Sequence, residues 1–188
     1  MRAVNLVIAV CVLASLGFWL LNPRTSLEYL VFSGDNLLNG RLWTPFTSLF
    51  LHATPLHLFS NMIFLYIFGN TVEREKGSGR ALGAFFSGGA LSSLLSVYFY
   101  PFDVTMIGAS AAIFTLAAIV MLIKPLKTVL FLIPQGLVAI LYFIYNAIAV
   151  YYNAQGNVAY ISNVIGFAIG VPFGIAWSKN WLQISSSP

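Results

Sequence analysis

The segment that decides the fold is residues 101–124, PFDVTMIGASAAIFTLAAIVMLIK. Its larger part is an apolar run that begins at Ser110 and ends before the charge of Lys124. A helix over residues 110–123, about 14 residues, is roughly 21 Å long. The hydrocarbon core of a bilayer is roughly 30 Å thick. Whether this short helix lies in a soluble core or in a membrane therefore depends on the rest of the chain.

The composition indicates a membrane protein. Only 7% of the 188 residues are charged and 59% are apolar, whereas soluble domains carry roughly 25% charged residues. The nine Lys and Arg lie between apolar runs and form no basic patch, so we expect a lipid bilayer and no nucleic-acid partner. Cys11 is the only cysteine, which excludes an internal disulfide and a thiolate metal site.

Six apolar runs are predicted to form helices within the membrane. They occupy approximately residues 3–21, 49–71, 80–100, 110–123, 128–152 and 158–177. The first run also has features of a signal peptide, but no small-residue cleavage site follows it, so we expect it to be retained as a helix. We therefore predict one domain over residues 1–188, an all-α membrane protein with a bundle of six transmembrane helices.

The positions of the positive charges predict the orientation. If the runs cross the bilayer in turn, all nine Lys and Arg except Arg24 and Arg41 lie on the same side as the N-terminus. Cytoplasmic loops carry the excess of Lys and Arg in membrane proteins. We therefore expect an integral, multi-pass membrane protein with both termini in the cytoplasm.

The short fourth run then has a consequence for the residues before it. With Lys124 at the cytoplasmic surface, a helix of this length begins at Ser110 inside the bilayer. Residues 101–109 must enter the membrane as non-helical backbone, in a re-entrant loop. Such backbone is tolerated only where it is buried in protein or lines water. A sheltered, wet cavity at Ser110 is therefore predicted.

Three polar side chains in the second run are candidates for function, because polar groups in membrane segments are costly. His57 and Asn61 are four residues apart, so they share one helix face and could direct hydrogen-bond donors at one point. The alternative is that they hold neighbouring helices together. For His52, which lies nearer the start of the run, this structural role is favoured.

Two other chemistries are excluded by the residues available. His52 and His57 are the only histidines, they are five residues apart, and no third ligand is evident, so we expect no metal. An aspartyl protease within the membrane would need two aspartates in its helices. The only aspartates, Asp35 and Asp103, lie in loops.

Ser110 is a further candidate, together with Gly108 and Ala109 before it. A serine in the first turn of a helix can simply cap free backbone N–H groups. The same N–H groups, at the positive end of the helix, would also stabilise an oxyanion formed beside that serine. The predicted topology therefore brings together a serine, backbone donors, a histidine and an asparagine.

In combination, these motifs resemble the rhomboids, a family of intramembrane serine proteases with a six-helix core. The resemblance covers residues 43–177, is to the prokaryotic form of the family, and implies a location in the plasma membrane of a prokaryote. The matching residues are Trp43, His52, His57, Asn61, Glu73, Gly108, Ser110, Gly166 and Gly170. It implies a serine endopeptidase that cleaves transmembrane segments of membrane proteins by a Ser-His dyad and needs no cofactor.

The resemblance also implies a role for each site residue. Ser110 corresponds to the nucleophile, and its backbone N–H, His57 and Asn61 correspond to the oxyanion hole. The general base of the family is a histidine, whereas this chain has Asn163 at that position. Because an amide does not accept the hydroxyl proton at neutral pH, the chain as given is expected to be inactive or severely impaired.

Three explanations of Asn163 remain open. It could be a substitution introduced to trap an inactive enzyme. It could mark a naturally inactive rhomboid-like protein that binds membrane proteins without cleaving them. In the third explanation, His57 or His52 serves as the base in a rearranged site. A small transporter or channel is a further rival, but it predicts polar residues along a whole path across the bilayer, whereas here they gather in one half.

The remaining family positions concern packing. Ala111 stands where the family usually has glycine, and Thr44 stands where it usually has arginine after Trp43. Phe114 follows Ser110 by one turn, where an aromatic often packs on the catalytic histidine, although an ordinary core role is the alternative. The spacing of Gly166 and Gly170 allows a close helix contact that would bring position 163 against the fourth helix.

Overall fold

A computed structural model of the chain describes residues 2–20, 29–129, 133–152 and 160–184, with the side chains of the last range described as far as Ser178. Helices make up most of these ranges. In chain order the elements are α1 (Ala3–Leu20), α3 (Gly34–Leu38), α4 (Thr44–Thr47), the 3₁₀ turn η1 (Ser48–Phe50), α5 (Pro55–Phe64), the π-helical turn η2 (Leu65–Gly69), α6 (Asn70–Lys76), α7 (Ser78–Ser96), α8 (Ser110–Ile123), β1 (Thr128–Val129), β2 (Ile133–Pro134), α9 (Gln135–Tyr151) and α10 (Tyr160–Ile184).

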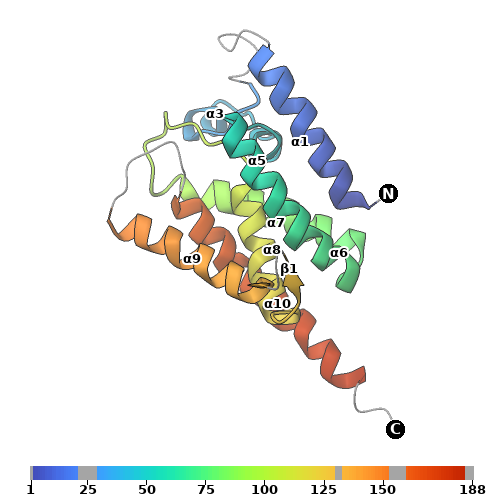
Figure 1. Cartoon of the computed structure of the whole chain (residues 1–188). Coiled ribbons are helices and arrows are strands. Elements are labelled where there is room, and N and C mark those ends of the chain that lie inside the picture. The colour runs from blue at the N-terminus through green and yellow to red at the C-terminus, as the bar shows by residue number, and fades with distance from the viewer. Residues whose placement is uncertain (1, 21–28, 130–132, 153–159, 185–188) are drawn as a thin grey trace.

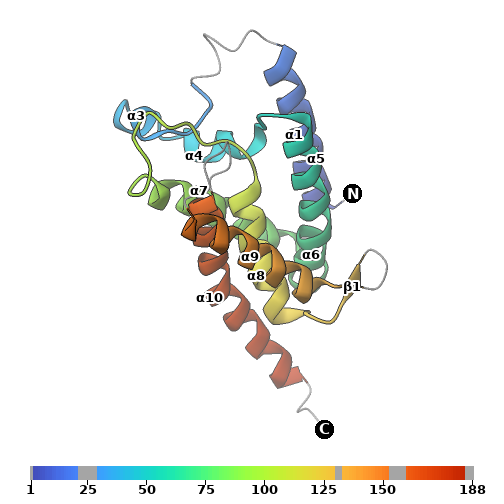
Figure 2. The same ribbon diagram turned by 60° about the vertical axis from the view of Figure 1, so that its left-hand side comes forward.

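Helix α8 is the centre of the fold. It begins at Ser110 and ends at Ile123, and every residue from Ala111 to Val120 is buried. A helix that is apolar on all sides requires neighbours on all sides. Figures 1 and 2 show these neighbours: α7, α9 and α10 surround α8, and the column formed by α5, η2 and α6 lies beside α1.

Small residues allow α7 and α10 to approach α8 closely. A Cβ atom added to Gly88 would overlap the side chain of Thr115, and one added to Gly166 would overlap the carbonyl oxygen of Ala111. Thr115 Oγ1 also donates a 2.8 Å hydrogen bond to the carbonyl of Gly166. The small residues therefore set the distance between α8 and the helix that carries position 163.

The second predicted helix starts later than expected. It was predicted from residue 49, but the chain leaves η1 after Phe50, and helix α5 begins only at Pro55. The two helical segments on either side of this break are bent by 96°. Proline disfavours a helical conformation in the residue before it and fits the first helical position. Thr54 caps the new helix, because its Oγ1 accepts a 3.1 Å hydrogen bond from the His57 N–H.

The fifth predicted helix also starts late, and here the all-α prediction was incomplete. Instead of beginning at residue 128, α9 begins at Gln135, and the residues before it form the short antiparallel pair β1 and β2. Pro134 has extended backbone angles and precedes the first helical residue. Its fixed φ and missing N–H are suited to the boundary of a helix and not to its interior. The predicted start of the sixth helix lies outside the described residues.

Residues 97–109, between α7 and α8, contain no helix. They are attached to the first loop through an isolated bridge, in which Phe32 N–H donates to Met106 O at 3.3 Å and Met106 N–H donates to Phe32 O at 2.7 Å. This backbone pairing fixes the position of the segment that leads to Ser110. That the segment enters the membrane stays a prediction.

Two of the described helices are long and apolar enough to cross a membrane: α1 and residues Tyr160–Ser178 of α10. The bent pair Thr44–Phe50 and Pro55–Lys76 makes a third if it counts as one span. Helices α8 and α9 are apolar but shorter. The count of six crossings therefore remains a prediction, whereas the helical, apolar character of the chain is established.

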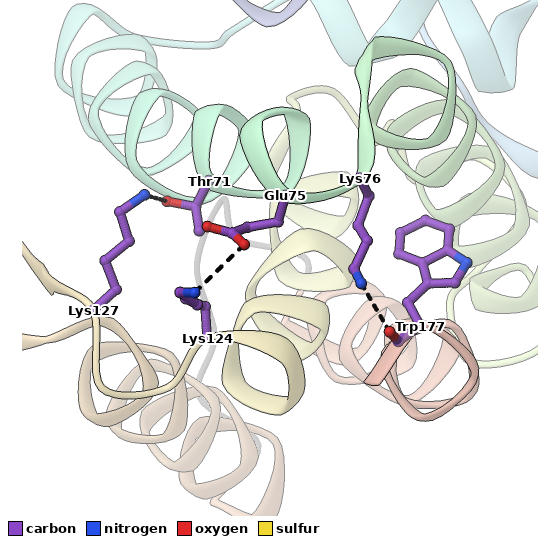
Figure 3. A network of polar contacts seen from close by, with 6 residues as sticks. All are labelled: Thr71, Glu75, Lys76, Lys124, Lys127 and Trp177. Atoms are coloured by element: carbon purple, nitrogen blue, oxygen red, sulfur yellow. Dashed lines mark hydrogen bonds and ion pairs between the residues drawn. The ribbon is translucent and has the colours of Figure 1, made fainter. Parts of the chain in front are cut away.

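Polar contacts gather at the end of the bundle where α6 and α8 finish (Figure 3). Lys76 Nζ donates to the carbonyl of Trp177 at 2.8 Å, Lys124 lies 3.6 Å from the Glu75 carboxylate, and Lys127 Nζ donates to Thr71 Oγ1 at 3.1 Å. Partial burial lowers the pKa of Lys127 below its ordinary value. These contacts attach α6 to α10 and to the end of α8.

Glu73 connects α6 to the beginning of α1. Its carboxylate accepts hydrogen bonds from the backbone N–H groups of Ala3 at 2.8 Å and Val4 at 3.0 Å, and from Ser78 Oγ at 2.6 Å. The first N–H groups of a helix have no partners within it, and a negative charge is favourable there. Glu73 thus has a structural position, at the opposite end of α5–α6 from His57.

We expect Glu73→Ala to destabilise the protein by about 1.5–3 kcal/mol, because hydrogen bonds to a charged group contribute on this scale and two helix N–H groups lose their partner. The measurement is thermal or denaturant unfolding in detergent micelles. Glu75→Ala is the matched control, since its ion pair with Lys124 is partly exposed and such pairs contribute roughly 0–1 kcal/mol. Equal losses for the two variants would contradict the capping role.

Candidate active site

A cavity of about 290 Å³ lies at the start of α8. It is lined by residues from the segment before α5 and from α5, α8, α9 and α10. These residues are Ala53, Thr54, Leu56, His57, Ser60, Asn61, Ser110, Tyr142, Tyr145, Asn146, Tyr160 and Asn163. Four of the predicted site residues therefore share this cavity: Ser110, His57, Asn61 and Asn163.

Gly108 brings the backbone before Ser110 against α5. Its φ is +117°, a conformation that favours glycine. A Cβ atom added to it would lie 2.7 Å from His57 Cε1 and 3.5 Å from Asn61 Nδ2. The Gly108 N–H donates to Ser48 O at 2.9 Å, which fixes the turn. The glycine therefore permits both the turn and the close approach of His57 and Asn61 to the start of α8.

His57 and Asn61 lie one turn apart on α5, and both line the cavity. Asn61 is buried, and its Nδ2 has no hydrogen-bond partner within the described part of the chain. A buried N–H donor without a partner is costly. This donor is thus available to a group that enters the cavity, next to the backbone of Gly108.

His52 does not line the cavity and instead contacts the residue before Ser110. It is fully buried, and its Nδ1 lies 3.0 Å from Ser15 Oγ, which also donates to Phe50 O at 3.2 Å. The Ala109 N–H donates to His52 Nε2 at 3.5 Å. Because Ser15 donates to the carbonyl, it accepts from an Nδ1–H, and Nε2 is free to accept. A neutral His52 thus connects α1 to the residue before Ser110.

Asn163 is held by a residue that the sequence reasoning missed. Its Nδ2 donates a 2.8 Å hydrogen bond to Asn146 Oδ1 on α9, and Asn146 Nδ2 in turn donates to Tyr142 O at 2.9 Å. Asn163 Oδ1 has no partner among the residues described. The signal that could have identified Asn146 is the one applied to Asn61, a polar amide within an apolar run.

The other predicted positions lie outside the lining of the cavity. Phe114 is fully buried and packs on the ring of Tyr142, with the ring centroids 4.3 Å apart. Trp43 is about half exposed and donates from its indole Nε1 to Tyr29 O at 2.8 Å. Gly166 and Gly170 face the backbone carbonyls of Ala111 and Thr115 on α8. Phe114, Gly166 and Gly170 are thus packing positions, whereas Trp43 makes a hydrogen bond within the first loop.

Chemically, the cavity combines a hydroxyl at the N-terminus of a buried helix with amide and imidazole groups from three other helices, α5, α9 and α10. In the described ranges, no three His, Cys, Asp or Glu side chains gather where they could hold a metal ion. Such an arrangement is suited to attack by the hydroxyl on a carbonyl, with N–H donors for the resulting oxyanion. A basic group in hydrogen-bond reach of Ser110 is the part that Asn163 does not supply.

Comparison with known proteins agrees with this class of site. Residues 39–180 match the Rhomboid domain, so the chain belongs to the rhomboid family. Among curated proteins it is 41% identical over 87 residues to Rhomboid-like protein 11, chloroplastic, of Arabidopsis thaliana, a match that covers 46% of this chain and 31% of that protein. It is 29% identical over 93 residues to Rhomboid protease GlpG of Salmonella newport, covering 50% of this chain and 32% of the relative.

The matched segments therefore span about a third of each relative's own length. The same identity and coverage hold for Rhomboid protease GlpG of Salmonella typhimurium. The family includes intramembrane serine proteases. The predicted family is thus confirmed, together with the apolar, helical class of fold.

Proposed function

We propose that this protein is built as an intramembrane serine endopeptidase that cleaves transmembrane segments of membrane proteins. The observation that carries the proposal is the single cavity that Ser110, His57, Asn61 and Asn163 line together. Ser110 is the nucleophile, and its backbone N–H, His57 and Asn61 form the oxyanion hole. Position 163 supplies the general base when it is histidine.

With histidine at position 163, the reaction balances as an ordinary acyl transfer. The imidazole takes the proton of Ser110 Oγ while Oγ attacks the carbonyl carbon, and the oxyanion is held by the N–H donors. Collapse of this intermediate breaks the peptide bond, and the imidazole gives its proton to the leaving amine. Water then attacks the acyl-enzyme by the same route and releases the acid.

With Asn163, the first of these steps lacks a base. The amide already donates to Asn146, and an amide oxygen does not hold a proton at neutral pH. The chain as given is therefore proposed to be inactive or severely impaired, whether Asn163 is natural or introduced. The second candidate function rests on the same contact. In it, the chain is a rhomboid-like protein in which the Asn163–Asn146 pair stands in place of a catalytic base, and the cavity binds membrane proteins without cleaving them.

We also infer that the protein is a multi-pass protein of a prokaryotic plasma membrane, with both termini in the cytoplasm. The orientation is supported by Lys76, Lys124 and Lys127, which gather at one end of the bundle (Figure 3), because cytoplasmic loops carry the excess of positive charge.

The nucleophile is tested by covalent labelling. We expect a fluorophosphonate reagent to label the Asn163→His variant and to leave the Asn163→His, Ser110→Ala double variant unlabelled, because only an activated serine reacts. Intact-mass analysis of the detergent-solubilised protein gives the readout. Ser87→Ala, which removes a serine hydroxyl on α7 outside the cavity lining, is the matched control and should leave labelling unchanged. Absence of labelling in Asn163→His, with its fold intact, would overturn the protease proposal and favour the binding function.

A further inference from the structure

Asn146 is a buried amide in an otherwise apolar stretch of α9. Its side chain is 1% exposed, and Asn163, which it contacts, is 2% exposed. Burying an amide away from water is costly unless its hydrogen bonds are made, so such a residue within a membrane helix is a candidate for function. Asn146 also lines the cavity that contains Ser110.

The hydrogen bonds of Asn146 determine how its amide is turned. The carbonyl of Tyr142, one turn earlier on α9, can only accept, so the group that faces it at 2.9 Å must be the donor Nδ2. Oδ1 is therefore directed at position 163, where it accepts from Asn163 Nδ2 at 2.8 Å. Asn146 thus presents a fixed hydrogen-bond acceptor to whatever side chain occupies position 163.

We propose that Asn146 is the positioning residue for the side chain at 163, the equivalent of a third member added to the Ser-His pair; this rests on the proposed function. Asparagine and histidine both carry a nitrogen bonded to Cγ, which is Nδ2 in one and Nδ1 in the other. An imidazole at position 163 can therefore donate from Nδ1–H to Asn146 Oδ1, in place of the Asn163 amide.

This contact has a direct chemical consequence. Neutral imidazole carries one proton, and holding it on Nδ1 leaves Nε2 as the acceptor. Nε2 then faces away from Asn146, and it is the nitrogen that receives a proton from the serine in Ser-His systems. Without Asn146, the ring loses both its preferred tautomer and its orientation.

The test uses the full chain in the Asn163→His background, with kcat and KM measured on a transmembrane substrate in detergent. We expect Asn146→Leu to lower kcat by roughly 10- to 100-fold with little change in KM, because a misdirected base costs on this scale. Gln135→Leu, which removes another buried amide at the start of α9 and outside the cavity lining, is the matched control and should leave kcat unchanged.

Asn146→Asp separates positioning from simple packing. A carboxylate also accepts from Nδ1–H and restores orientation, but its charge favours the imidazolium. We therefore expect Asn146→Asp to recover kcat above Asn146→Leu and to move the acidic limb of the pH profile to higher pH. Equal kcat values and pH profiles for the parent, the Leu and the Asp variants would overturn the proposal.

A spectroscopic readout keeps the proposal testable even if the parent does not cleave. In ¹⁵N-histidine spectra of the Asn163→His variant, the imidazole at 163 should show the Nδ1–H tautomer, and Asn146→Leu should shift it toward Nε2–H. An unchanged tautomer would refute the role of Asn146, whatever the activity. Failure of cleavage with the expected tautomer would instead refute the proposed protease function and leave the contact established.

Discussion

Cleavage of a transmembrane substrate is expected to rise by at least about 10²- to 10⁴-fold when Asn163 is replaced by histidine, the range that general-base assistance supplies. Ser110, His57 and Asn61 already line one cavity together with position 163. The added ring atoms have room, because Asn163 lines a cavity of about 290 Å³. Since nucleophile and base act as a unit, the gain can exceed this range.

The measurement is the rate of cleavage of a fluorogenic transmembrane peptide by purified protein in detergent or proteoliposomes. Asn163→Gln is the matched control, because it enlarges the side chain but keeps an amide, and it should stay inactive. Cleavage by the unaltered chain at the rate of Asn163→His would show that another group, such as His57, is the base. No cleavage by either protein would favour the binding function.

The second large effect on activity is expected from Gly166→Ala, which adds a single methyl group to α10. A Cβ atom at position 166 would overlap the carbonyl oxygen of Ala111, which belongs to the backbone of α8 and cannot move aside. Helix α10 must then withdraw, and the Thr115 hydrogen bond to the Gly166 carbonyl is strained. Position 163 lies about one turn away and moves with it.

In the Asn163→His background, we expect Gly166→Ala to lower kcat by roughly 10²-fold, since a displacement of about 1 Å between reacting groups costs this much. Overpacking should also destabilise the fold by about 1–3 kcal/mol. Gly83→Ala is the matched control, because nothing lies within 4 Å of the added methyl, and alanine favours a helix over glycine. Unchanged activity and stability in Gly166→Ala would mean that this contact does not align the site.

The parts of the fold that could be predicted are those that depend on local pattern. The apolar run between Gly108 and Lys124 sets the bounds of α8, because a glycine turn precedes it and a charge follows it. The spacing of His57 and Asn61 places them on one face of α5 by helical geometry alone. Ser110 at the start of a helix follows from the same two signals.

The parts that could not be predicted depend on backbone chemistry within apolar runs or on distant partners. Hydrophobicity alone predicts that the second helix includes Leu51 and Thr54. Pro55, however, restricts the backbone of the residue before it, so the helix begins only at Pro55. Pro134 does the same before α9. The pairing of Asn146 with Asn163 joins two helices, so it requires knowledge of how α9 and α10 pack.

The cap that Glu73 places on α1 also has a consequence for biosynthesis. The N–H group of Ala3 and its partner carboxylate are separated by 70 positions in the chain. During translation, α1 is therefore synthesised well before the side chain that caps its N–H groups. They are capped only after the segment through Glu73 has been synthesised and has returned to the same side of the bundle. The hydrogen bonds from Ala3 and Val4 to Glu73 thus form only in a chain whose α6 has packed in its final place beside α1.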